Sequence, residues 1–219
     1  MRRIATLEDI GEGLEALCKA DARLHAVRDV AGEIPLRVNA PGFGSIAAVV
    51  VSQQVSTASA AAIFGRLARL LDPLTPAAVL AASDALFREA GLSRPKQKAL
   101  LAIATAVQQG LDLEGVASRS GDEAMAALTA VPGIGPWTAE VYLLTAAGHP
   151  DIFPSRDVAL QAAGHHAFGL ESRPTHKALE ALAESWSPWR AVAARLFWAY
   201  YRTIKGRDGL LTAPNSSEN

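Results

Sequence analysis

Cysteine is almost absent from this sequence of 219 residues, in which Cys18 is the only one. One thiol cannot form a disulfide within the chain, and it cannot supply the ligands of a cysteine-bound zinc or iron–sulfur centre. We therefore expect no iron–sulfur cluster. The sequence also lacks an apolar run of the roughly 18–20 residues that a membrane span needs. These absences predict a protein of the reducing cytoplasm that does not associate with membranes.

Charge of one sign is not in excess either, because 21 Lys and Arg residues stand against 22 Asp and Glu residues, for a net charge of -1. This balance excludes a polybasic nucleic-acid coat. Basic residues still gather locally, with five between residues 186 and 207 and three between residues 91 and 110, and neither stretch contains an acid. Each stretch is typical either of a small DNA-binding face or of a solvated helix surface.

Alternating strand patterns are nearly absent, whereas alanine-rich segments repeat apolar residues at spacings of three and four. The sequence therefore predicts an all-α fold. Pro136 and Pro188 fit first helical positions, and Thr175 and Ser187 fit N-caps. The expected helices cover residues 6–19, 44–72, 75–90 in two short pieces, 95–109, 121–130, 136–147, 157–168, 175–185 and 188–204, and a looser stretch at 30–44 links the first helices to the rest.

A turn rich in proline and glycine interrupts the helical pattern at residues 128–139, which read Leu-Thr-Ala-Val-Pro-Gly-Ile-Gly-Pro-Trp-Thr-Ala. Pro132 cannot continue the preceding helix, while Gly133 and Gly135 let the backbone turn tightly and approach another molecule. The pattern predicts two helices joined by a hairpin whose free amides point outward and suit a phosphate group. A Gly-x-Gly pair between two helices is, however, often only a turn.

These residues resemble the hairpin of the helix-hairpin-helix DNA glycosylases, in which a Gly/Pro-rich loop is followed by an aspartate. The stretch Asp-Ile-Phe-Pro-Ser-Arg-Asp-Val at 151–158 is similar to the aspartate loop, with Asp157 in the place of the aspartate. Three more stretches match: Ser-Gln-Gln-Val-Ser at 52–56, Gly-Leu-Ser at 91–93 with Lys96 and Lys98, and Trp-Ser-Pro-Trp-Arg at 186–190, running on to Trp198. The resemblance covers roughly residues 40–204, is strongest to the 3-methyladenine DNA glycosylase II branch, and implies two helical lobes around a cleft.

Asp157 is the catalytic residue that the resemblance implies. Glycosidases that cleave a bond to oxygen need two carboxyl groups, one of which protonates the leaving group. A purine alkylated at N3 or N7 is already cationic and leaves as a neutral base, so one carboxylate that stabilises the sugar cation is enough. From the residues alone, Asp157 is also a good N-cap for the helix expected at 158–168, and Glu140 is a second acid close to the hairpin.

The resemblance also implies a base pocket walled by Trp137 and Trp198, since a cationic base stacks well on an indole ring. Trp198 lies in an apolar run and fits a core residue equally well. Val141 and Val158 stand where the family has pocket aromatic residues, which predicts a roomier pocket. Relatives that also cut the strand carry a Schiff-base lysine in the place of Trp137, so we expect base removal without lyase activity.

Contacts with DNA are implied for residues of several motifs. Gln54 stands in the place of the wedge that fills the space left by the extruded base, although it also fits a polar residue at a helix end. The full set is Gln53, Gln54, Lys96, Lys98, Gly133, Gly135, Thr138 and Arg190, of which the basic residues meet phosphates. The family hairpin tends to hold a monovalent cation, sodium or potassium, through main-chain carbonyls, here those of Thr129, Val131 and Ile134; no other cofactor is required.

The chain is expected to consist of N-terminal helices at 1–40 that pack on the second lobe, a glycosylase domain at 41–207 and a flexible tail at 208–219. The predicted function is that of a monomeric DNA glycosylase of base excision repair that binds damaged double-stranded DNA. It releases alkylated purines of the 3-methyladenine and 7-methylguanine type. Two alternatives stay open: a glycosylase for neutral lesions such as hypoxanthine or uracil, and a non-catalytic helix-hairpin-helix module that only binds DNA.

Overall fold

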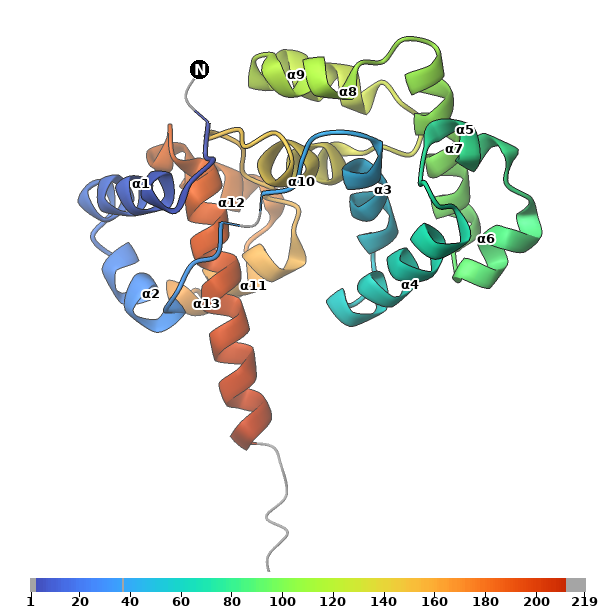
Figure 1. Cartoon of the computed structure of the whole chain (residues 1–219). Helices are drawn as coiled ribbons and strands as arrows, with labels where there is room; N and C mark the ends of the chain where they lie inside the picture. Colours follow the sequence, from blue (N-terminus) through green and yellow to red (C-terminus); the bar gives the residue numbers. More distant parts are fainter. Residues whose placement is uncertain (1–2, 37, 212–219) are drawn as a thin grey trace, which may run out of the picture. The chain divides into compact units, whose positions relative to one another are not determined.

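The computed structural model describes residues 3–36 and 38–211, and every regular element in these ranges is a helix (Figure 1). The described residues form two compact units. Unit 1 consists of residues 38–149, and unit 2 consists of residues 3–36 together with residues 150–211. The predicted all-α class is confirmed. Within the described ranges, no helix is both long enough and apolar enough to cross a membrane.

Unit 1 is built around helix α3 (Phe43–Ser52), because the sequence of this helix is nearly all apolar. The side chains of Ile46, Val50 and Val51 are fully buried, and α3 packs against α4, α7 and α10. The other helices of unit 1 are α4 (Thr57–Leu70), α5 (Pro76–Ala81), α6 (Asp84–Ala90), α7 (Arg94–Gln108), α8 (Leu113–Ser118), α9 (Gly121–Thr129) and α10 (Pro136–Thr145).

Short polar side chains begin most helices of unit 1. The hydroxyls of Ser56, Thr75, Ser83 and Ser120 each accept a hydrogen bond from a backbone amide in the first turn of their helix. Such a cap stabilises a helix by about 1 kcal/mol. Caps of this kind can hold short helices such as α5 and α6, which are too brief to persist alone.

The single helix predicted over residues 44–72 is wrong, since a turn at residues 53–56 separates α3 from α4. Gln54 has a φ of 54°, in the left-handed region that non-glycine residues seldom adopt. The hydroxyl of Ser56 then accepts from the amide of Ser59 and starts a new helix. Two short helices, α8 in unit 1 and α2 in unit 2, were also not predicted.

Unit 2 is assembled on α13 (Arg190–Leu211), the long helix drawn in red in Figure 1. Helices α1, α2 and α11 pack against it. Gly13 permits a close approach, because a Cβ at this position would lie 2.8 Å from the ring of Trp189. The elements are α1 (Leu7–Ala20), α2 (Leu24–Ala31), α11 (Val158–Ala167), α12 (His176–Ala183), the 3-10 helix η1 (Glu184–Trp186) and α13.

Helix α13 differs from the prediction at both ends. It begins at Arg190, so Pro188 is not a first helical residue and Ser187 is not its N-cap. It continues to Leu211, beyond the expected end at residue 204, and the rest of the predicted tail, 212–219, lies outside the described residues.

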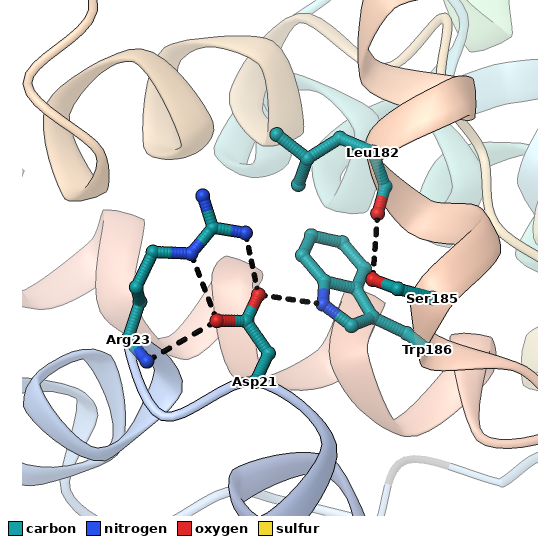
Figure 2. A network of polar contacts seen from close by, with 5 residues as sticks. All are labelled: Asp21, Arg23, Leu182, Ser185 and Trp186. Carbon is teal, nitrogen blue, oxygen red and sulfur yellow. Dashed lines mark hydrogen bonds and ion pairs between the residues drawn. The ribbon is translucent and has the colours of Figure 1, made fainter.

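The core of unit 2 contains a fully buried indole. The ring of Trp186 contacts Phe153, Phe168 and Phe197, and its Nε1 donates to Asp21 at 3.2 Å (Figure 2). Arg23 donates to both oxygens of Asp21, at 2.8 and 2.7 Å. These hydrogen bonds, the one from Arg23 first, outweigh burial and lower the pKa of the Asp21 carboxyl. The start of the chain is thereby joined to η1 near its other end.

Candidate active site and DNA-binding hairpin

The predicted hairpin lies between α9 and α10 in unit 1. Helix α9 ends at Thr129, the amide of Ile134 donates to the carbonyl of Val131, and Pro136 occupies the first position of α10. Gly133 and Gly135 are exposed, and among the described residues their amides have no hydrogen-bond partner. Two free amides next to a helix N-terminus suit an anionic group such as a phosphate.

Gly133 is required for two separate reasons. Its φ is 86°, and a Cβ at this position would lie 2.8 Å from the Cβ of Ala99 on α7. The hairpin therefore packs directly on α7. Lys98, the residue before Ala99, is exposed, and its phosphate contact stays a prediction.

The turn between α3 and α4 is fastened to the hairpin. The side-chain amide of Gln53 donates to Thr138 Oγ1 at 2.9 Å and to the carbonyl of Gly133 at 3.5 Å. The structure thus brings together three of the residues predicted to contact DNA. Gln54, at the tip of the same turn, is exposed, as is its neighbour Val55. Its exposure fits both roles given for Gln54 from the sequence, the wedge and a polar residue at a helix end, so the wedge stays a prediction.

Lys96 and Arg190 have protein partners, which the sequence did not reveal. Lys96 is only 7% exposed and its Nζ donates to the carbonyl of Val51 at 2.8 Å, in the last turn of α3. Burial lowers the pKa of this ammonium group. Arg190 binds Asp151 through two hydrogen bonds. Both arrangements favour a structural role for these two basic side chains.

Asp157 and Trp198 meet within unit 2. The Oδ1 atom of Asp157 accepts from the amides of Ala159 and Leu160, at 2.9 and 3.1 Å, in the first turn of α11. The indole Nε1 of Trp198 donates to the same oxygen at 3.2 Å. Asp157 is therefore the N-cap of α11, one of the two roles predicted from the sequence. The bond from Trp198 is not needed for a cap and links the carboxylate to α13.

Trp198 also differs from its neighbours on α13. Residues 191–197 and 199–200 are buried, whereas Trp198 is partly exposed. This favours the functional interpretation of Trp198 over that of a core residue. Trp137 and Val141, on α10 in unit 1, are partly exposed, and Val158 is 61% exposed directly after Asp157.

Two polar residues near Asp157 were missed in the sequence. Asp151 lies six residues before Asp157 and is the acceptor for Arg190 and Ser187. Ser155 is 1% exposed, and its hydroxyl lacks a hydrogen-bond partner among the described residues. The only available signal was their place in the stretch 151–158, because their partners lie more than 30 residues away or do not exist within the described chain.

The described residues contain no cluster of three His, Cys, Asp or Glu side chains that could hold a metal ion. The predicted monovalent cation involves none of these side chains. Its predicted donors, the carbonyls of Thr129, Val131 and Ile134, belong to the hairpin segment, and that of Val131 also accepts from the amide of Ile134. Neutral carbonyl oxygens are suitable ligands for a hard cation of low charge.

Comparison with known proteins identifies similar structures and sequences. The 3-methyladenine DNA glycosylase of Schizosaccharomyces pombe in complex with abasic DNA has a TM-score of 0.78 and 25% identity, over 89% of this chain and 97% of that one. A DNA-3-methyladenine glycosidase from Bacillus halodurans has a TM-score of 0.75 and 28% identity, over 92% and 96% of the two chains.

The probable bifunctional transcriptional activator/DNA repair enzyme AlkA of Mycobacterium tuberculosis is 32% identical over 210 residues, which cover 90% of this chain. The matched region is 41% of that relative, so the chain spans about two fifths of its length. The family model of the HhH-GPD superfamily of base excision DNA repair proteins matches residues 47–188, which include the hairpin, Asp151 and Asp157. The resemblance noted in the sequence is thus confirmed, and the chain belongs to the HhH-GPD superfamily.

Proposed function

We propose that this protein is a monofunctional DNA glycosylase of base excision repair that releases alkylated purines from double-stranded DNA as a monomer. The observation that carries the proposal is the carboxylate of Asp157, fixed by two amides of α11 and by the indole of Trp198. Its place in the family's aspartate loop supports the same role. The relatives described as 3-methyladenine DNA glycosylases support the substrate class.

Asp157 acts by electrostatics in this proposal. As the bond between the sugar and a cationic base lengthens, positive charge moves from the base onto the deoxyribose ring. A carboxylate held by three donors does not need to reorganise when that charge develops, and such preorganisation is the main source of stabilisation in many active sites. The base leaves neutral, and water completes the hydrolysis at C1′.

The test measures release of 3-methyladenine, 7-methylguanine and hypoxanthine from treated duplexes by chromatography, with wild type beside Asp157→Asn. The amide oxygen of asparagine can still cap α11 and accept from Trp198, so the variant removes the charge and keeps the fold. We expect release by wild type and a loss of at least about 100-fold in the variant, the scale on which one electrostatic group contributes.

Asp112→Asn is the matched control, because Asp112 caps α8 in the same way. Its Oδ1 accepts from the amides of Glu114 and Gly115, at 3.1 and 2.9 Å. We expect wild-type release from this variant. If Asp157→Asn retains most of its release rate while it binds DNA normally, Asp157 is not the catalytic residue and Glu140 becomes the next residue to test.

The same assay separates the two alternative functions. Release of hypoxanthine without the methylated purines would identify a glycosylase for neutral lesions. Binding to DNA with no base released would identify a module that only binds.

Trp137 and Trp198 are proposed to stack on the cationic base, because indole faces attract cations by about 0.5–2 kcal/mol.

Absence of lyase activity is a separate part of the proposal. A Schiff base with the sugar requires an amine, and the five lysines of the chain include none between Lys98 and Lys177. Borohydride should therefore trap no covalent complex between the protein and a duplex with an abasic site. A trapped complex together with strand cleavage would contradict this part.

Binding to the duplex is assigned to unit 1. The amides of Gly133 and Gly135 with the ammonium of Lys98 provide phosphate contacts, and Gln54 fills the gap in the base stack. The monovalent cation would be held by the carbonyls of Thr129, Val131 and Ile134 and would fix the hairpin. Replacement of sodium and potassium by a bulky quaternary ammonium ion at constant ionic strength should then weaken DNA binding in wild type.

A further inference from the structure

The segment from Pro150 to Asp157 is tied to α13 at both of its ends. At the first end, Asp151 accepts from Arg190, and the amide of Ala191 donates to the carbonyl of Pro150 at 2.8 Å. At the second end, Asp157 accepts from Trp198. Arg190 and Trp198 are eight residues apart on one helix, which corresponds to about 12 Å. Both ends of the segment that carries the Asp157 carboxylate are therefore bonded to the same helix, α13.

The contact at the first end is short and has two hydrogen bonds between the same two side chains. Arg190 Nε lies 2.6 Å from Asp151 Oδ1 and Arg190 Nη2 lies 2.8 Å from Oδ2, while Ser187 Oγ donates to Oδ2 at 2.9 Å. Both partners are about 30% exposed. A planar guanidinium that donates two parallel hydrogen bonds to a carboxylate fixes the orientation of the two groups as well as the distance between them. The ammonium group of a lysine does not fix this orientation.

The interior of the segment is buried, since Ile152, Phe153 and Ser155 are at most 9% exposed, and it is held by packing and by uncharged hydrogen bonds. The amides of Ser155 and Asp157 donate to the carbonyls of Phe153 and Pro154, both at 2.8 Å, so these bonds stay within the segment. Phe153 contacts the ring of Trp186 edge-on, and Gln161 donates to the carbonyl of Ser155. The pair of Asp151 with Arg190 adds a charged contact at the start of this packed segment.

We propose that Asp151 and Arg190 are positioning residues that hold Asp157 at its hydrogen bond with Trp198. This inference rests on the proposed function for its effect on base release. Arg190 then acts inside the protein, through Asp151, instead of on a DNA phosphate. The two roles of Arg190 predict different effects of substitution. A contact with a DNA phosphate needs Arg190 alone, whereas the pair of Asp151 and Arg190, called the clamp below, needs both residues.

The experiment compares Arg190→Gln, Asp151→Asn and the double variant. Base release is measured as a single-turnover rate constant at saturating protein, and affinity is measured separately on undamaged duplex. We expect each single variant to lose about 10- to 100-fold in the rate constant, the scale of a small misplacement of a catalytic group. The double variant should be no slower than the singles, and the Kd of Asp151→Asn for DNA should stay at the wild-type value.

Arg23→Gln is the matched control, since the Arg23–Asp21 pair is also bonded at two points and also lies in unit 2. It removes the same charge and should keep the wild-type rate constant. Arg190→Lys keeps the positive charge but cannot make two parallel hydrogen bonds with Asp151. Its rate constant should lie between those of wild type and Arg190→Gln. All rates are measured well below the Tm of each variant, so that loss of folded protein does not enter.

A second readout does not depend on activity. The indole N–H resonance of Trp198, assigned with a Trp198→Phe variant, should exchange faster with solvent in Arg190→Gln and Asp151→Asn and stay unchanged in Arg23→Gln. If this resonance and the rate constant are both unaffected, the clamp is refuted. If Arg190→Gln weakens DNA binding while Asp151→Asn is inert, Arg190 contacts phosphate. If wild type releases no base, the proposed function fails, and the resonance still decides on the clamp.

Discussion

Replacement of Gly133 by alanine should destabilise the protein by about 2–5 kcal/mol, as the sum of two costs. The φ of 86° places this residue in the left-handed region, where a Cβ costs about 1–2 kcal/mol. The new methyl would also lie 2.8 Å from the Cβ and 3.1 Å from the Cα of Ala99. Neither atom can rotate away, and overpacking of this kind typically costs about 1–3 kcal/mol.

Thermal unfolding followed by far-ultraviolet circular dichroism measures the effect. For a chain of this length, each kcal/mol corresponds to about 2–4 °C in Tm. Gly135→Ala is the control within the same hairpin, since Gly135 has a φ of -84° and no atom lies within 4 Å of a Cβ built there. Its N-cap position limits the expected loss to about 1 kcal/mol.

DNA affinity should separate the same two variants. Relief of the clash requires the hairpin to move away from α7, which carries the outward amides out of position, so Gly133→Ala should bind undamaged duplex more weakly in fluorescence anisotropy. The reasoning is refuted if Gly133→Ala and Gly135→Ala have the same Tm. It is also refuted if Gly133→Ala loses stability but binds DNA as tightly as wild type.

Three further predictions concern unit 2. Trp198→Phe keeps an aromatic ring but removes the donor to Asp157, so the single-turnover rate of base release should fall about 10- to 100-fold, as expected for a hydrogen bond to a charged group; an unchanged rate would contradict this. Ser155→Ala removes a buried hydroxyl that has no partner among the described residues and should raise stability by up to about 1–3 kcal/mol in urea unfolding; a destabilised variant would show that the hydroxyl is satisfied. Burial alone would raise the pKa of the Asp151 carboxyl, but hydrogen bonds from Arg190 and Ser187 outweigh it and lower the pKa. The resulting stabilisation is complete above the ordinary aspartate pKa and is lost as the pH falls through the lower value, so acid titration of Asp151→Asn should show a shallower loss of stability than wild type.

The hairpin could be predicted from the sequence because its signals are local. Pro132, Gly133 and Pro136 restrict the backbone through their own covalent structure, and the structure places the turn and the helix start where these residues require them. Asp157 was predicted both as an N-cap and, by resemblance, as the catalytic residue. The structure confirms the cap, while its catalytic role stays a prediction.

The break at Gln54 could not be predicted in this way. Residues 52–56 contain neither glycine nor proline, and the left-handed backbone at Gln54 lies beside contacts from distant parts of the chain. Lys96 binds the carbonyl of Val51, and Gln53 reaches Thr138, 85 residues away. Such tertiary contacts override the helical pattern that runs through the segment.

The basic stretches show the same limit. Counting charges between residues 186 and 207 predicted either a small DNA-binding face or a solvated helix surface, yet Arg190 pairs with Asp151, and Arg195 is 3% exposed and donates from its Nε to the carbonyl of Leu36. Burial lowers the pKa of Arg195 to about 10. The sign of a side chain's charge can be read from the sequence. Whether that side chain points to solvent or into the protein depends on which carbonyls and carboxylates the fold brings near it.

The hydrogen bond from Trp186 to Asp21 joins residues 165 positions apart. Helices α1 and α2 precede unit 1 in the chain, whereas their packing partner, α13, follows it, so they are synthesised well before that partner. Unit 1 is continuous in sequence and can fold meanwhile, whereas unit 2 must close a long chain loop before its core exists. A nascent chain arrested before α13 is therefore expected to expose the apolar faces of its first two helices to chaperones and proteases.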